Sequence, residues 1–215
     1  MPELDDLFVA LQESHPGIPL DKIIEQFKIR IEHYAKVAEP YMHTKENRVN
    51  LAYSFMKEVD KIVEEMPQEG KDMIRCQKGC AHCCRMRVAV SQAEAEVLLE
   101  ASKNLDIKIN KDYLRKQAEV TEDGWSFTPH NRCVFLDKDD TCKIYEYRPI
   151  ACRKYLVHTN PKYCNIQKYP KTKVASLFLT NAETIVAGLC AVDKYGDLSL
   201  PQALLKVMDE DEQQP

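Results

Sequence analysis

Cysteine is the residue type with the clearest chemical pattern in this chain. Eight of the nine cysteines stand in one ordered array: Cys76, Cys80, Cys83, Cys84, Cys133, Cys142, Cys152 and Cys164. Thiols used only for packing would be scattered singly, each acting as a small hydrophobe. Thiols grouped at short loop spacing are instead typical ligands of soft or borderline metals. The array therefore predicts a metal-binding protein with these eight cysteines as ligands.

The spacing favours a metal without fixing which one. Cys76, Cys80 and Cys83 fit one compact loop in which Gly79 permits a sharp turn. Three such thiolates suit three corners of an iron–sulfur cube or three positions of a zinc tetrahedron. The paired knuckles of zinc ribbons are missing apart from Cys80 and Cys83, so we favour an iron–sulfur cluster slightly over zinc. One cluster plus a second site, or two metal sites, would use all eight sulfurs.

The adjacent pair Cys83 and Cys84 leaves three interpretations open. Side chains of neighbouring residues diverge unless the backbone bends, so the pair can bridge a centre or serve two centres. Alternatively, one thiol is left as a group beside the metal or as a redox group. The ninth cysteine, Cys190, lies outside the array at the end of an apolar helix and is expected to be a core thiol.

The bulk composition is that of an ordinary globular protein. The chain has 215 residues, 44% of them hydrophobic and 30% charged, with a net charge of −4. We expect no bulk nucleic-acid binding, because that function usually leaves a basic surface. The acidic start lacks the pattern of a signal peptide, and no run is long enough to span a membrane. A cytoplasmic location, where thiols stay reduced, is therefore expected in preference to a disulfide framework.

Basic residues accompany the cysteines. They fall around the first four and again around the later ones: Lys71, Arg75, Lys78, Arg85, Arg87, Arg132, Lys143, Arg148, Arg153 and Lys154. Thiolates on a metal leave net negative charge, so nearby cations are expected to balance it, although a solvated basic surface would account for some of them.

Helices are expected to supply the scaffold that positions the array. Apolar residues recur at helical spacing over residues 4–11, 21–39 and 45–66, and Pro67 and Gly70 close the last of these. These segments predict a helical layer whose aromatic residues pack in the core.

The cysteine region combines helices with a small β element. Ser91 followed by Glu94 is a capping-box signature that predicts a helix over residues 92–103. A second helix is predicted over 110–120. Residues 86–90 form a short β-type run, and a β-hairpin with a cysteine on each arm is predicted around residues 137–140, before a break at Arg148 and Pro149.

We therefore predict a mostly α (α+β) fold, a helical scaffold around a cysteine-rich metal-binding domain with a small β-hairpin. The predicted parts are an N-terminal helical region (1–70), a cysteine-cluster metal-binding domain (71–168), C-terminal helices packing on it (169–208) and a disordered acidic tail (209–215). Helices are expected over 173–189 and from Ser199.

Other side chains near the array are weaker candidates. His82, His130 and His158 stand close to cysteines, but with eight thiols present they are expected to act beside the metal rather than on it. Trp125 and Phe127 could shield a cluster, with core packing as the default. Glu146 with Arg148 and Arg153 could form a catalytic group, but a structural salt bridge before Cys152 is favoured.

The order and spacing of these residues resemble a known family. The pattern runs Cys76-x3-Cys80-x2-Cys83-Cys84, Cys133-x8-Cys142, Arg148-Pro149-x2-Cys152-Arg153 and Cys164. It is similar to the YkgJ-type cysteine-cluster family, also called the CxxCxxCC or zinc- or iron-chelating domain, over roughly residues 76–164. Ser91 and Glu94 also resemble the helix start that follows the first cluster in that family. The resemblance implies metal chelation.

Whether the chain is an enzyme stays open at this point. The family is distantly similar to flagellin lysine N-methylases, which implies an alternative: a cluster-dependent, S-adenosylmethionine-dependent protein lysine methylase. No glycine-rich nucleotide loop supports it, and the β/α units of radical S-adenosylmethionine enzymes are missing. A metal carrier or thiol redox switch is a further alternative. The partner, a protein or a small molecule, is unknown.

Overall fold

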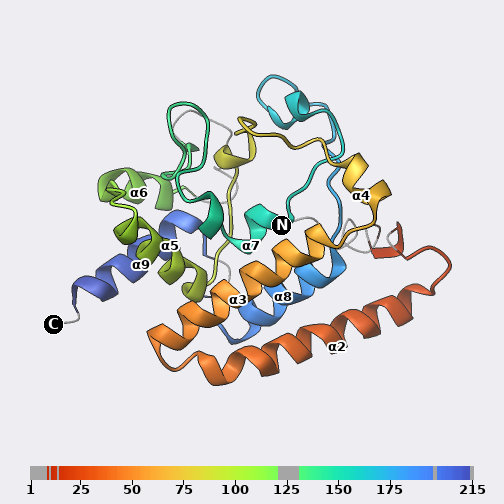
Figure 1. Ribbon diagram of the computed structural model, residues 1–215, viewed down its shortest axis with the longest axis horizontal. Helices are drawn as coiled ribbons and strands as arrows, with labels where there is room; N and C mark the ends of the chain where they lie inside the picture. Colours follow the sequence, from red (N-terminus) through yellow and green to blue (C-terminus); the bar gives the residue numbers. More distant parts are fainter. Residues whose placement is uncertain (1–8, 10, 14, 121–130, 196–197, 214–215) are drawn as a thin grey trace.

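Helices make up most of the computed structural model, which describes residues 9, 11–13, 15–120, 131–195 and 198–213 (Figure 1). The longer helices are α2 (Leu20–Ala38), α3 (Lys45–Glu64), α5 (Gln92–Asn104), α6 (Lys111–Ala118), α8 (Thr180–Val192) and α9 (Leu200–Glu212). The connecting segments contain two short helices, α4 (Gln68–Met73) and α7 (Ile150–Lys154), and several 3₁₀ turns. The predicted mostly helical fold is confirmed.

Local signals account for the helices that were predicted. Thr44 caps α3 by accepting a hydrogen bond from the backbone N–H of Asn47. Ser91 and Glu94 form both bonds of the capping box at the start of α5, as their spacing indicates. The predictions over 21–39, 45–66 and 92–103 are therefore confirmed to within two residues at each end.

The helices form two neighbouring packed groups that share α5 (Figure 1). One group contains α2, α3 and α8, and the other α5, α6 and α9. Residue 188 is a glycine where α8 crosses α2, and a Cβ there would lie 2.5 Å from the Cβ of Tyr34. The absent side chain therefore allows the close approach of the two helices. Apolar residues of the cysteine region, Phe135 and Ile144, enter the core beside α9.

The predicted β-hairpin does not form strands. Among the described residues, extended segments meet only at isolated antiparallel bridges, including one between Leu136 and Cys142. The turn itself is present, since the backbone N–H of Asp137 donates to Thr141 O at 2.7 Å. Asp140 adopts a left-handed conformation with φ +61°. Beyond the bridge, the N–H of Lys143 donates to the carbonyl of Phe135 at 2.9 Å. The β-type run at 86–90 is likewise reduced to one bridge, between Ala89 and Ser199.

Three further expectations differ from the structure. Helix α8 begins at Thr180 and not near residue 173, because residues 175–177 run beside 156–158 and exchange backbone hydrogen bonds with them. Arg148 and Pro149 do not only break the chain: Pro149 opens the short helix α7. Residues 209–212 were expected to be disordered, yet they continue α9.

Lysines from other helices explain the ordered acidic end. Asp211 pairs with Lys45 (2.9 Å) and Lys103 (2.6 Å), and Lys111 pairs with Asp209 and Glu212. The predicted elements at residues 4–8, and Trp125, Phe127 and His130, lie outside the described residues. No helix in the described part of the chain has the length and apolar character needed to cross a membrane.

Candidate metal centre

The eight cysteines of the array come from four separate segments. The first four lie in a loop that ends in the 3₁₀ turn η2 (Cys83–Arg85), where Gly79 adopts the predicted sharp turn with φ +83°. Cys133 and Cys142 lie on either side of the turn at 137–141, Cys152 lies in α7, and Cys164 ends the 3₁₀ turn η5 (Pro161–Cys164). All eight are free thiols.

Backbone hydrogen bonds join these segments. The N–H of Cys133 donates to the carbonyl of Cys84 at 2.7 Å. The N–H of Arg75 donates to the carbonyl of Val157 at 2.8 Å, and the N–H of Val157 donates to the sulfur of Cys76 at 3.4 Å. The first loop is thereby fixed on one side to the segment of Cys133 and on the other to the segment that leads to Cys164.

Cys83 interacts electrostatically with six other thiols of the array. Burial is the largest cause that raises the pKa of the other array thiols with a resolved shift, and repulsion from the Cys83 thiolate contributes in each case: Cys76, Cys80, Cys133, Cys142, Cys152 and Cys164. The pKa of Cys83 itself is raised first by a side-chain hydrogen bond with Cys84 and then by burial. The array predicted from the sequence therefore converges within electrostatic range of one residue.

Six of the thiols have a backbone hydrogen bond that favours the thiolate; in Cys83 and Cys164 it involves the residue's own amide, and in four others the amide of another residue. Cys76 has the N–H of Val157 described above. Burial raises the pKa of Cys80, Cys133 and Cys142, but in each an opposing hydrogen bond comes from the amide two residues further along the chain: His82, Phe135 and Ile144 respectively. Such donors stabilise a charged sulfur and are the same contacts that tune metal–thiolate centres.

The raised pKa values set the protonation of the metal-free site. Burial raises the pKa of Cys133 to about 12 and that of Cys164 to about 11. Burial also raises the pKa of Cys152 well above its usual range, with repulsion from Cys133, Cys83 and Cys142 adding to the effect. At neutral pH these thiols therefore keep their protons until a metal displaces them.

Two arginines lie beside this part of the array. The pKa of Cys142 is raised by burial, and the guanidinium of Arg148 acts in the opposite direction; Arg132 does the same for Cys133. The cations expected to balance thiolate charge are therefore present at two of the eight sulfurs. Arg148 also stacks over the ring of Tyr145 at 3.8 Å.

The buried carboxylate of Glu94 ties α5 to α7. Its Oε2 accepts hydrogen bonds from the N–H and the hydroxyl of Ser91, and its Oε1 accepts from the N–H of Ile150 at 2.9 Å. Glu94 therefore supplies the cap that α7 lacks in its own sequence and holds the helix that carries Cys152.

Arg153 has a structural role, as the sequence favoured, but its carboxylate partner is not Glu146. The side chain is 1% exposed and forms an ion pair with Asp60 of α3. It also donates to the carbonyls of Arg148 and Glu146. The Glu146 carboxylate is 71% exposed and lies 4.0 Å from Lys57. Arg153 thus locks the turn before Cys152 onto the helical layer.

Tyr155 is a member of the site that the sequence did not single out. Burial raises its pKa to about 12, and repulsion from the thiolates of Cys164, Cys83 and Cys76 adds to the shift. The only signal was an aromatic residue between Cys152 and Cys164. His82 contributes its backbone amide, and His158 lies in the segment that pairs with Ala175, where its N–H donates at 3.1 Å.

The donor set fits a thiolate-bound metal in its chemistry. All the array cysteines except Cys76 are buried or half-buried. Their thiolates would repel one another, and several of the sulfurs accept a hydrogen bond from a backbone N–H. In the part of the chain that the structure describes, no three Cys, His, Asp or Glu side chains are arranged so that they could hold a metal ion as they stand. Binding of a metal ion would therefore require these thiols to turn towards it.

Comparison with protein families supports the same interpretation. Residues 75–174 match the family model named CxxCxxCC, described as a putative zinc- or iron-chelating domain. This part of the chain is therefore similar to the CxxCxxCC domain, and the name is used below for residues 75–174. All eight cysteines of the array fall inside the matched range, and Cys190 falls outside it. No curated protein matches the chain, and no solved structure matches it either.

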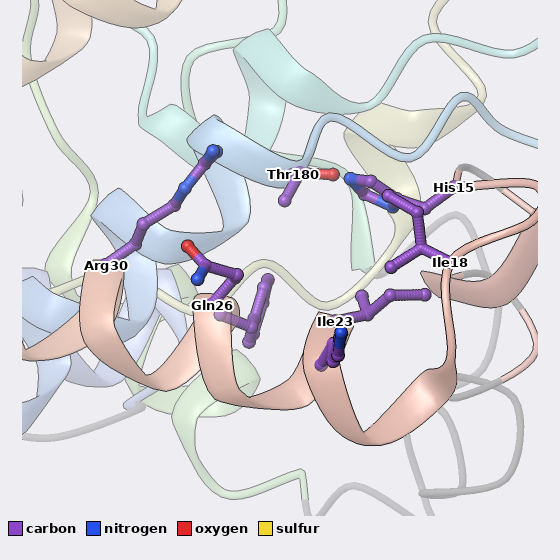
Figure 2. Close-up of a pocket in the computed structure, with 8 residues that line it drawn as sticks. His15, Ile18, Ile23, Gln26, Arg30 and Thr180 are labelled. Carbon is purple, nitrogen blue, oxygen red and sulfur yellow. The ribbon is translucent and has the colours of Figure 1, made fainter.

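A separate cavity lies outside the CxxCxxCC domain. It has a volume of about 290 Å³ and lies between α2, the turn before it and the start of α8 (Figure 2). It includes no cysteine, and its lining residues are Ile18, Ile23 and Phe27 together with His15, Lys22, Gln26, Arg30 and Thr180. Arg30, at its edge, hydrogen-bonds to Asn181. The cavity therefore takes no part in the candidate metal centre.

Proposed function

We propose that the CxxCxxCC domain binds metal through the thiolates of its eight-cysteine array, as an iron–sulfur cluster or as zinc, with iron–sulfur the first candidate. The observation that supports this most strongly is that backbone hydrogen bonds join the loop of the first four cysteines to the segments of Cys133 and Cys164, within electrostatic range of Cys83. Cysteines that serve only in packing are usually scattered, whereas these thiols lie close enough for each thiolate to raise the pKa of its neighbours.

The residues around the sulfurs suit this role. The backbone amides of His82, Phe135, Ile144 and Val157 already point at four sulfurs and would stabilise the charged form. Bound zinc would supply a closed structural tie between the segments, and a cluster would supply electron transfer. In either case the chain's own residues hold the sulfurs, exclude water and balance part of the negative charge.

The loop from Cys76 to Cys83 is the reason to place iron–sulfur first. Its three closely spaced thiols suit a cube, and a reducing cytoplasm would keep them available. Nothing observed in the described residues favours S-adenosylmethionine chemistry, so the methylase alternative gains no support from them.

The test is the metal and acid-labile sulfide content of protein purified without oxygen, together with its visible absorption. Iron with matching sulfide and a brown colour is the expected result. Colourless protein with stoichiometric zinc would keep metal binding and remove the iron–sulfur candidate. Protein that holds neither metal, and takes up neither on reconstitution, would refute the proposal.

A further inference from the structure

The eight thiols divide into two sets according to the segments that carry them. In the first set, the loop of Cys76 and Cys80 runs beside residues 155–157, through the bonds from Arg75 to Val157 and from Val157 to the Cys76 sulfur. Residues 155–157 lead directly into the η5 turn that ends at Cys164. Among the thiols, the largest electrostatic partners of Cys164 are Cys80 and Cys76.

The second set lies on the other side of the first loop. Cys133 and Cys142 flank one closed turn, with a bridge between Leu136 and Cys142. Cys152 lies in α7, and its electrostatic partners among the thiols are Cys133, Cys83 and Cys142. The backbone therefore holds Cys133 and Cys142 together in one turn, and Cys152 completes the second set of three thiols by its electrostatic contact with both.

Cys83 and Cys84 lie where the two sets meet. The carbonyl of Cys84 accepts the N–H of Cys133 at 2.7 Å, which fixes this residue to the second set. Cys83 is separated from Cys80 by two residues, and the Cys80 sulfur receives the amide of His82 between them. That spacing is the metal knuckle of zinc sites, so Cys83 completes the first set.

We propose that the CxxCxxCC domain builds two adjacent four-thiolate centres and that the neighbouring residues Cys83 and Cys84 give one ligand to each. The first centre has Cys76, Cys80, Cys83 and Cys164 as ligands. The second has Cys84, Cys133, Cys142 and Cys152. This inference rests on the proposed function, because it assigns ligands to metals that the domain must first bind.

The ligand count supports the division. A zinc ion or a four-iron cluster takes four thiolates, so eight converging thiols fill two centres without a remainder. The 3₁₀ turn at Cys83–Arg85 supplies the bent backbone that two adjacent residues need to serve different centres. Because Cys83 also interacts with Cys133, Cys142 and Cys152, the two centres are neighbours.

The test is an anaerobic titration of the metal-free full chain with Co²⁺, whose absorption distinguishes tetrahedral thiolate ligation and does not depend on which metal is native. We expect saturation at two Co²⁺ per chain, both displaced by Zn²⁺. Saturation at one Co²⁺ would overturn the two-centre inference and leave the proposed function standing. Absence of any thiolate–cobalt absorption would instead refute the proposed function.

Variants assign the ligands. Cys164→Ser and Cys142→Ser should each lose one of the two equivalents, and the double variant should lose both. Cys83→Ser and Cys84→Ser should each lose one, whereas loss of both equivalents in Cys83→Ser alone would show a shared ligand and overturn the division. Cys190→Ser, outside the array, is the matched control and should keep two. Far-ultraviolet circular dichroism of each variant separates loss of a centre from loss of the fold.

Discussion

Arg153, next to the candidate ligand Cys152, forms an ion pair with Asp60 near the C-terminal end of α3. The two residues are 93 positions apart in the sequence. Arg153 is buried and Asp60 is 23% exposed, so the pair is largely shielded from water. The contact connects the segment of the candidate metal centre to a helix outside residues 75–174, the range that matches the family model.

Removing the charge of Asp60 should therefore destabilise the protein. Asp60→Asn leaves the buried Arg153 guanidinium without its carboxylate, and breaking a buried pair from one side costs about 3 kcal/mol or more of the free energy of unfolding. Urea unfolding of the metal-free protein measures it. The control is Asp112→Asn, whose partner Arg115 is exposed, with an expected change below about 0.5 kcal/mol. Equal effects of the two substitutions would contradict the role given to Arg153.

Glu94 should be needed for the position of α7. Glu94→Gln keeps the size of the side chain but places an NH₂ group against donors from Ser91 or Ile150. An unsatisfied buried donor costs about 1–3 kcal/mol, so thermal or urea unfolding should detect the change. Glu100→Gln, on the same helix, is the control and is expected to be nearly neutral. A neutral Glu94→Gln would show that α7 does not depend on this cap.

Metal uptake should release protons. The pKa of Cys133 is raised to about 12 and that of Cys164 to about 11, so both thiols are protonated at pH 7 and must lose a proton to become ligands. We expect about four protons per bound ion, and affinity that rises with pH up to these values. Calorimetric titration with Zn²⁺ in buffers of different ionisation enthalpy measures the number. Release of fewer than about two would mean that the thiols are already ionised.

The metal-free protein should lose stability in alkali for the same reason. An unfolded thiol ionises near pH 8.5, whereas the folded Cys133 and Cys164 hold their protons to higher pH. Their contribution is fully present below about pH 8.5 and is lost as pH rises towards their folded pKa values. The free energy of unfolding, measured from pH 7 to 10, should fall less steeply in Cys133→Ala. An unchanged slope would contradict the raised pKa of Cys133.

Gly188 provides a test of the packing between α2 and α8. In Gly188→Ala the new Cβ would lie 2.5 Å from Tyr34 Cβ and 2.9 Å from the carbonyl of Ile31, so the helices must separate. We expect a loss of about 1–3 kcal/mol in urea unfolding. Gly70→Ala is the control, since its Cβ meets only the flexible side chain of Met66. That substitution should be neutral or stabilising, because alanine favours a helix.

The sequence predicted those elements whose signals are local. The cap of α5 needs only Ser91 and Glu94, three residues apart, and it was predicted correctly. The start of α8 was wrong because Val174, Leu177 and Phe178 have helical spacing, while the backbone at 175–177 pairs with a segment almost twenty residues earlier. Helix α7 was missed because its cap is Glu94, 56 positions away.

In the candidate site, too, some features have local sequence signals and others depend on distant contacts. The eight ligands remain a prediction from residue type and spacing, because clustered cysteines in a chain of this size are typical of a metal site. The contacts that hold the site in place could not be predicted from residue type and spacing. Asp60 carries no mark in the sequence that predicts a contact with Arg153, and the order of residues 209–212 depends on distant lysines such as Lys103 and Lys111. Which thiols share a centre also depends on backbone contacts between separate segments.

The most direct test of the central claim is X-ray absorption at the edge of whichever metal the anaerobically purified protein carries. A metal held by the cysteine array should show a shell of sulfur only, at about 2.3 Å for zinc thiolate. Short distances to nitrogen or oxygen in place of that sulfur shell would contradict binding by these eight cysteines.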